Sequence, residues 1–208
     1  MNADDVRDLA RSAPSRWTEL DLVHRSSSGE HLEVTLRHGV LEGRDVRTGR
    51  RIRETEEPSS AHVRPAEPYP TNYLWCAMLD PYELCHDVAL TEITEGERFG
   101  RPVVSFVAHA GLGYDPICTC CPLVFSEASE RHEQPDGWRP APDEMPDGVE
   151  LALDLEVGIV VSSRDRGGRL GGWFTTEIMR HRSSSSGAPH GPGRSCAGEG
   201  NLQDGVRP

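Results

Sequence analysis

Residues 149–179 read VELALDLEVGIVVSSRDRGGRLGGWFTTEIM, and the pattern of this segment indicates a sheet protein. Apolar and polar side chains alternate in three segments, residues 149–155, 159–164 and 173–178. A period of two is typical of half-buried β-strands. Gly158 and a Gly-Gly pair separate the segments, as glycines do at turns. The stretch therefore predicts three strands joined by short turns.

The same alternation recurs upstream in three pairs of segments, residues 18–25 with 30–39, 40–46 with 50–56, and 88–95 with 102–110. The second pair is charged enough to be an edge or a solvent-facing hairpin. Apolar residues at helical spacing predict a helix over residues 3–12, which Pro14 should end. The apolar run 73–79 predicts a second helical element, interrupted at Pro81. The pattern predicts an α+β fold: a curved, mostly antiparallel sheet, an open or half barrel, with helices in its concave face.

The length of 208 residues suits one domain with a tail. We expect a single domain over residues 1–182. Residues 183–208 are poor in apolar side chains and are predicted to be disordered, and the acidic, proline-rich residues 126–148 are predicted to form a long surface loop.

The chain has 34 acidic and 22 basic residues and a net charge of −12. Such a charge opposes binding to nucleic acid or to an anionic bilayer. No apolar run approaches the roughly 20 residues of a transmembrane helix, and acidic residues stand where a secretory signal has basic ones. The sequence therefore predicts a cytoplasmic protein with no transmembrane segment and no nucleic-acid partner.

Residues 115–123, DPICTCCPL, place Cys118, Cys120 and Cys121 within four positions. Three interpretations stay open: thiols packed as small apolar groups, a zinc site, or a reversible disulfide. In an extended chain Cys118 and Cys120 would share an ion while Cys121 faced away. A fourth ligand would then come from Cys76, Cys85 or His86. No nucleophile, base and orienting group can be assembled from the spacing, so no catalytic residue is assigned and an enzyme is not favoured.

Four local patterns together resemble the LolA-like lipoprotein-carrier superfamily. Two are turns, Gly100-Arg101-Pro102 before an apolar strand and Asp-x-x-x-Gly from Asp154 to Gly158. The others, NYLWCAMLDPYEL (72–84) and GYDPICTCCPL (113–123), are similar to an uncharacterised cytoplasmic actinobacterial-type group with an MLDPxEL segment and a CxCC corner. The resemblance covers roughly residues 3–180.

The resemblance implies non-catalytic binding or carriage of an apolar or acyl ligand, or of a lipidated partner protein, in the hollow of the sheet. Aromatic and apolar side chains would line that hollow, and the candidates are Tyr73, Trp75, Met78, Tyr82, Tyr114 and Trp173. No cofactor is expected on this interpretation. The alternative is a zinc-binding or thiol-redox module centred on Cys118, Cys120 and Cys121, with zinc as its cofactor.

Overall fold

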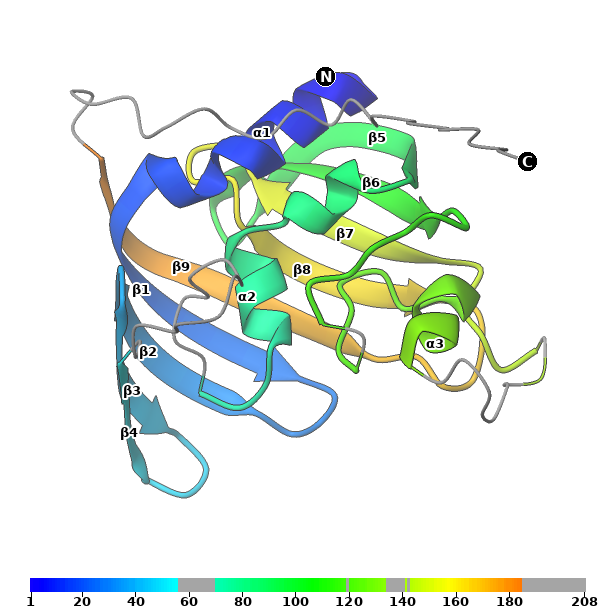
Figure 1. Cartoon of the computed structure of the whole chain (residues 1–208). Helices are drawn as coiled ribbons and strands as arrows, with labels where there is room; N and C mark the ends of the chain where they lie inside the picture. The colour runs from blue at the N-terminus through cyan, green and yellow to red at the C-terminus, as the bar shows by residue number, and fades with distance from the viewer. Residues whose placement is uncertain (56–69, 119, 134–140, 142, 185–208) are drawn as a thin grey trace, which may run out of the picture.

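The computed structural model describes residues 1–55, 70–118, 120–133, 141 and 143–184. Its main feature is one antiparallel sheet of nine strands in the order β4-β3-β2-β1-β9-β8-β7-β6-β5 (Figure 1). The strands are β1 (Trp17–Ser26), β2 (His31–Arg37), β3 (Val40–Asp45), β4 (Arg51–Thr55), β5 (Val88–Arg98), β6 (Arg101–Ala110), β7 (Gly148–Asp154), β8 (Val160–Arg166) and β9 (Trp173–Ser183). Two meanders, β1–β4 and β5–β9, are joined where β1 pairs with β9. The predicted sheet is confirmed.

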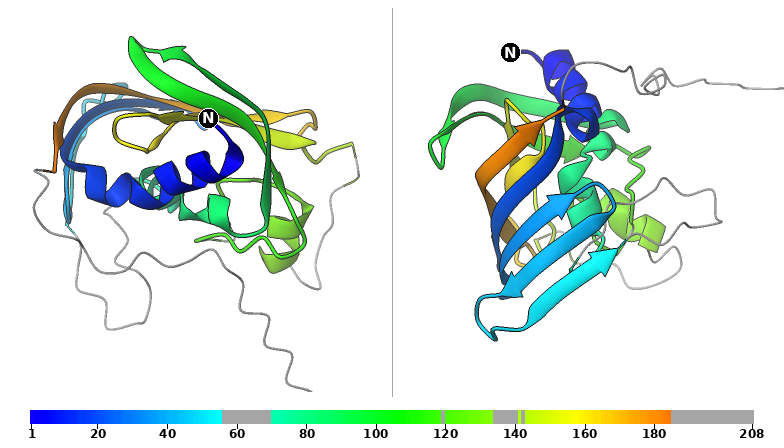
Figure 2. Two further views of the ribbon diagram at one scale, coloured as in Figure 1. Left: turned by 90° about the horizontal axis from the view of Figure 1, so that it is seen from above. Right: turned by 90° about the vertical axis from the view of Figure 1, so that its left-hand side faces the viewer.

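The sheet curves around three helical elements, which lie in its concave face (Figure 2). They are α1 (Ala3–Arg16), α2 (Leu74–Leu79) and the 3-10 helix η1 (Tyr82–Cys85). A fourth helix, α3 (Glu127–Glu133), lies beside the start of β7 and the end of β8 in Figure 1. The predicted helices in the concave face are therefore confirmed. The expectation of a loop throughout residues 126–148 was wrong, because Ser126 and Ser129 exchange hydrogen bonds at the start of α3.

Helix α1 begins at a reciprocal cap and does not end at Pro14. The Asn2 side chain accepts from the amides of Asp4 and Asp5, and the Asp5 carboxylate accepts from the Asn2 amide. Although proline removes one helical hydrogen bond, the helix continues to Arg16 because Ala13 and Trp17 on either side are fully buried. The burial of Ala13 and Trp17 therefore outweighs the tendency of proline to end a helix.

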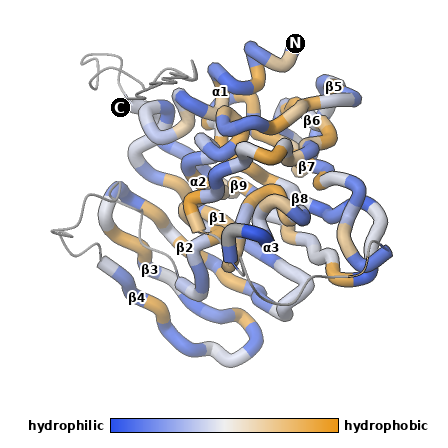
Figure 3. The backbone as a smooth tube through the Cα atoms, turned by 45° about the vertical axis from the view of Figure 1, so that its right-hand side comes forward, coloured by the Kyte–Doolittle hydropathy of each residue, from blue (hydrophilic) through white to orange (hydrophobic). Residues whose placement is uncertain are grey.

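Apolar and polar residues alternate along the strands, as the hydropathy colours in Figure 3 show. Because successive side chains point to opposite faces, this alternation separates buried from exposed side chains. In β9, Phe174, Thr176 and Ile178 are buried, whereas Trp173 and Met179 are exposed. Strands β4 and β5 form the two edges of the sheet. Strand β4 exposes Arg51, Arg53 and Glu54, which confirms the prediction of a charged edge.

The two turns noted in the sequence are held together by one ion pair. The Arg101 guanidinium donates to both oxygens of the buried Asp154 carboxylate, at 2.6 Å and 3.0 Å. The Asp154 side chain also accepts from the amides of Glu156 and Val157 within its own turn. Gly158 closes this turn at φ 78°, where a Cβ would lie 2.9 Å from the Leu9 carbonyl oxygen of α1. The ion pair thus fixes the start of β6 relative to the β7–β8 turn, and Gly158 lets α1 pack closely against that turn.

The tail predicted over residues 183–208 lies outside the described residues from position 185 onward, and its first residue, Ser183, is the last residue of β9. Within the described part of the chain, no helix is both long and apolar enough to span a membrane.

Candidate three-thiol site

The carboxylate of Glu83 connects the two cysteine-bearing sequence motifs. Glu83 lies in η1, is fully buried, and accepts from the Ile117 amide at 2.7 Å and from the Leu123 amide at 2.9 Å. These two amides flank the cysteines on either side. A single side chain from the first motif therefore fixes both ends of the loop that carries Cys118, Cys120 and Cys121.

Tyr114 completes this buried network. Its phenol donates to the Glu83 carboxylate and accepts from the Val124 amide at 3.1 Å. Burial raises the pKa of Glu83, partly offset by the hydrogen bonds from Tyr114, Leu123 and Ile117. Burial and the neighbouring carboxylate also raise the pKa of Tyr114, so the phenol stays a donor.

The loop turns instead of running extended, and this brings all three thiols together. The Cys121 amide donates to the Cys118 carbonyl at 3.4 Å, an i to i+3 turn contact. The three Sγ atoms all lie within 4.8 Å of one another. The Cys118 and Cys120 sulfurs are 2.9 Å apart, and the Cys120 and Cys121 sulfurs are 3.8 Å apart. The expectation that Cys121 faces away was wrong, because it assumed an extended backbone.

The thiols are also accessible from solvent. Cys120 is exposed and Cys118 and Cys121 are partly buried, unlike Cys76, which is 4% exposed in the core. Burial opposes ionisation of Cys118, but hydrogen bonds from the Cys120 and Cys121 thiols and amides outweigh it, and the pKa of Cys118 is lowered. The hydrogen bond with Cys118 raises the pKa of Cys120, and burial raises that of Cys121. One thiol of the three thus ionises most readily.

The three residues that the sequence suggested as a fourth metal ligand, Cys76, Cys85 and His86, are not part of the thiol cluster. Among the described residues, the group of metal-binding side chains at this corner comprises the three cysteines. Cys85 is near Arg11 of α1, with 4.0 Å between its sulfur and the guanidinium, and His86 packs edge-on against Tyr82. After the hydrogen bond with Cys118 and burial, the charge of the Glu133 carboxylate at the end of α3 also contributes to raising the pKa of Cys120.

The six residues predicted to line a ligand cavity are not brought together. Trp75, Met78 and Tyr114 are packed in the core at 1% exposure or less. Tyr73 is 43% exposed on the surface, and Tyr82 is partly buried beside His86. Trp173 lies on the opposite face of the sheet, because it alternates with the inward-facing Phe174.

The sequence did not lead us to expect a buried polar side chain inside the hollow, that of His24. The His24 ring is 2% exposed; its Nδ1 is 2.9 Å from the Thr176 hydroxyl, and its Nε2 is 3.6 Å from the Glu30 carboxylate. The ring also stacks at a tilt on Trp75, with centroids 4.6 Å apart. The signal was present in the sequence, because His24 shares the inward face of its strand with Leu20 and Leu22. Glu83 was missed for a similar reason, as an acid inside an apolar segment.

The comparisons with known proteins give likenesses of structure only. No family model and no curated protein matches the sequence. Among solved structures, the chain is similar to the Mycobacterium tuberculosis lipoprotein LppX, at 10% identity and a TM-score of 0.47, over 86% of this chain and 94% of that one. It is also similar to MucB in complex with MucA(peri), at 15% identity and a TM-score of 0.44, and to the Pseudomonas aeruginosa MucA/MucB complex, at 15% identity and a TM-score of 0.42. These two matches cover 90% and 91% of this chain but only 58% and 59% of the matched chains. Membership of the lipoprotein-carrier superfamily stays a prediction.

Proposed function

We propose that this protein binds a thiophilic d10 metal ion, Zn²⁺ or Cu⁺, through Cys118, Cys120 and Cys121. The observation that carries the proposal is the convergence of three Sγ atoms to within 4.8 Å on one loop. Thiolates are soft ligands that select Zn²⁺ and Cu⁺ over the hard cations Mg²⁺ and Ca²⁺.

One of the sulfur–sulfur distances already matches such an ion, and a second would lengthen on binding. A metal–sulfur bond of about 2.3 Å in tetrahedral geometry separates the ligand sulfurs by about 3.8 Å. The Cys120 and Cys121 sulfurs are 3.8 Å apart. The Cys118 and Cys120 sulfurs, at 2.9 Å, would move apart by about one ångström on binding.

The loop is held in advance of binding. The Glu83 carboxylate accepts from the amides of Ile117 and Leu123 on either side of the cysteines, which limits the conformations that the loop adopts. Supporting hydrogen bonds of this kind orient metal ligands and contribute to affinity. Burying the Glu83 carboxyl group costs desolvation free energy. The hydrogen bonds from Tyr114, Ile117 and Leu123 offset this cost.

Metal content of the purified chain tests this proposal. Elemental analysis after reconstitution with Zn²⁺, or with Cu⁺ under reducing conditions, should give about one ion per chain, and Cys120→Ser should lower the affinity by about tenfold or more. Cys85→Ser is the matched control, because Cys85 is partly buried but lies outside the cluster, and it should retain full occupancy. Equal metal affinity in the two variants would refute the site.

The same experiment separates metal binding from thiol redox chemistry. The 2.9 Å between the Cys118 and Cys120 sulfurs also permits these two thiols to form a disulfide, each losing a proton and an electron to an added oxidant such as oxidised glutathione. A protein that takes up no metal, but loses two hydrogens in its intact mass and two titratable thiols, is a redox module instead.

A second candidate, binding of an apolar or acyl ligand in the hollow, is favoured by the buried indole N–H of Trp75. Among the described residues this Nε1 atom has no hydrogen-bond partner, and Trp75 is 1% exposed beside His24. A ligand with an acceptor head group, such as a fatty acid or the acyl group of a lipidated protein, would satisfy this donor while its chain packed against the apolar side chains of the hollow. Native mass spectrometry should reveal a co-purifying ligand. A bare apo mass without binding of a fluorescent fatty acid would exclude this candidate and leave the metal site untouched.

A further inference from the structure

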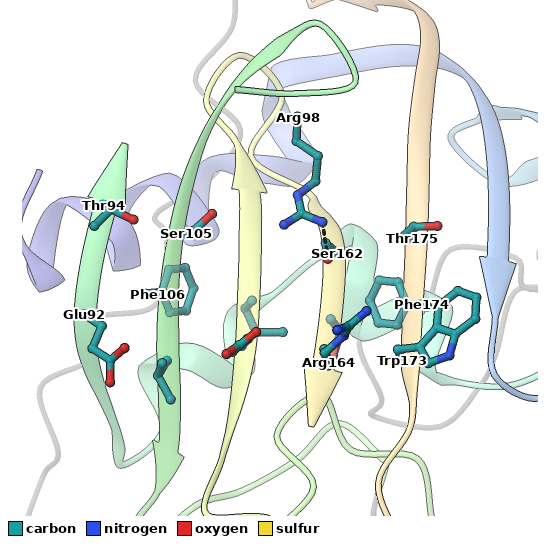
Figure 4. Close-up of a pocket in the computed structure, with 14 residues that line it drawn as sticks. Glu92, Thr94, Arg98, Ser105, Phe106, Ser162, Arg164, Trp173, Phe174 and Thr175 are labelled. Carbon is teal, nitrogen blue, oxygen red and sulfur yellow. Dashed lines mark hydrogen bonds between the residues drawn. The ribbon is translucent and has the colours of Figure 1, made fainter. Parts of the chain in front are cut away.

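A polar groove of about 380 Å³ lies on the face of the sheet opposite the helices, across β5 to β9 (Figure 4). The hollow is on the other face, where the Thr176 hydroxyl of β9 contacts the Met78 sulfur. Trp173 and Thr175, which alternate with Thr176 along β9, line the groove. The volume falls in the range of about 300–1,000 Å³ typical of small-molecule sites.

The floor of the groove is a row of hydroxyl groups that crosses the strands. The registers pair Thr94 with Ser105, Ser105 with Ala152, Ala152 with Ser162, and Ser162 with Thr175. Five neighbouring strands therefore place four hydroxyls and one methyl group side by side on one face, and all four hydroxyl-bearing residues line the groove. Each hydroxyl both donates and accepts a hydrogen bond.

The β5–β6 hairpin closes one end of this row. Figure 4 shows Arg98 reaching from the hairpin toward β8, where its guanidinium donates to the Ser162 hydroxyl at 3.0 Å. Since β5 and β8 are separated by two strands in the sheet, the hairpin must bend over this face. Arg164 and the 42%-exposed Trp173 stand next to each other at the β8–β9 side in Figure 4.

The charges along the groove are of both signs. Glu150 is directly opposite Arg164 in the register, and Glu92 is paired with Arg166 at 2.6 Å. Within the described part of the chain, neither Arg98 nor Arg164 makes an ion pair. The groove thus offers charged donors and charged acceptors together, which disfavours an anion as well as a cation, and its polar floor disfavours an acyl chain.

We propose that this groove binds a neutral saccharide. A sugar ring presents hydroxyls that both donate and accept, which matches the mixed row of hydroxyls, guanidinium groups and carboxylates. Its apolar C–H face packs against an indole, and Trp173 is the exposed aromatic side chain at the rim. The site is independent of the three-thiol cluster and of the hollow.

Saturation-transfer NMR with a panel of neutral sugars tests the assignment. The panel is glucose, galactose, mannose, N-acetylglucosamine, maltose and cellobiose at millimolar concentrations, with glucose 6-phosphate as the anionic arm. At least one neutral sugar should receive saturation, and its affinity should fall by about tenfold in Trp173→Ala and in Ser105→Ala. Both residues are at least partly exposed, so the fold should tolerate these truncations.

Met179→Ala is the matched control, because Met179 is 61% exposed on the same face of β9 but does not line the groove. This variant should bind as the wild type does. Absence of transfer to every neutral sugar, transfer to glucose 6-phosphate alone, or an unchanged affinity in Trp173→Ala would each overturn the proposal.

Discussion

At the scale of single residues, Glu83 joins the two cysteine-bearing segments of the sequence. One of its carboxylate oxygens accepts from Ile117 and the other from Leu123, and Tyr114 donates to the same group. The sequence showed the cysteine pattern and the apolar segment, but it could not show that an acid in one motif is bonded to the backbone of the other. That contact depends on tertiary packing between η1 and a loop more than thirty positions away.

Glu83→Ala should lower the free energy of unfolding. The change leaves two amides and a phenol without their acceptor, at about 1–3 kcal/mol for each buried group, so we expect a loss of at least about 3 kcal/mol in the free energy of unfolding. Urea denaturation followed by tryptophan fluorescence measures it. Glu83→Gln keeps one acceptor oxygen and should recover part of both the stability and the zinc affinity. A Gln variant with wild-type stability but no metal binding would contradict the positioning role.

Glu30 provides a prediction of pH dependence. Burial opposes ionisation of this carboxyl, but the His24 ring and the Ser26 and Thr71 hydroxyls outweigh it and lower the pKa to about 2. A lowered carboxyl pKa contributes stability that is fully present above the usual pKa of 4.5 and is lost as the pH falls toward 2. The contribution is about 3 kcal/mol at neutral pH.

Unfolding of the wild type and of Glu30→Gln should be compared between pH 7 and pH 3. Because other acids contribute equally to both proteins, the difference between the two curves isolates Glu30. We expect the difference to be largest at neutral pH and to shrink below pH 4.5. A constant difference over this range would show that the Glu30 carboxylate is not stabilised in the folded protein.

At the scale of elements, the alternation of apolar and polar residues was sufficient to locate the strands, but the ends and breaks of helices were not predictable in the same way. Strands β7 and β8 begin and end within two residues of the predicted bounds. Strand β9 begins at Trp173 as predicted but runs five residues past the predicted end at Ile178, because it stays paired with β1 as far as Ser183. Pro14 was expected to stop α1, yet the buried Ala13 and Trp17 hold the last turn in place. Local propensity is weaker than burial at such positions.

The thiol loop and the groove show the same limit. Cys121 joins Cys118 and Cys120 because the backbone turns, and sequence spacing alone could not distinguish a turn from an extended chain. The hydroxyl row across β5 to β9 arises from strand registers, which depend on bulges such as the one between Thr91 and Thr94. The sequence shows which residues have thiol or hydroxyl groups, but it does not predict that these groups lie side by side in the fold.

At the scale of the whole molecule, the curved sheet separates three candidate sites. The thiol loop extends from the helical layer, the hollow is filled by Trp75, Met78 and their neighbours, and the saccharide groove occupies the opposite face. Each site uses different residues, so a variant of one should leave the others unchanged. The arrangement suits a binding protein whose sheet is the common scaffold.

X-ray absorption spectroscopy of the metal-loaded protein determines whether the three thiols bind one ion. At the zinc or copper edge, we expect a shell of three sulfur atoms at about 2.3 Å from the metal, and a shell reduced to two in Cys121→Ser. A spectrum with only nitrogen and oxygen neighbours, or one unchanged by Cys121→Ser, would contradict the assignment of Cys118, Cys120 and Cys121 as one metal site.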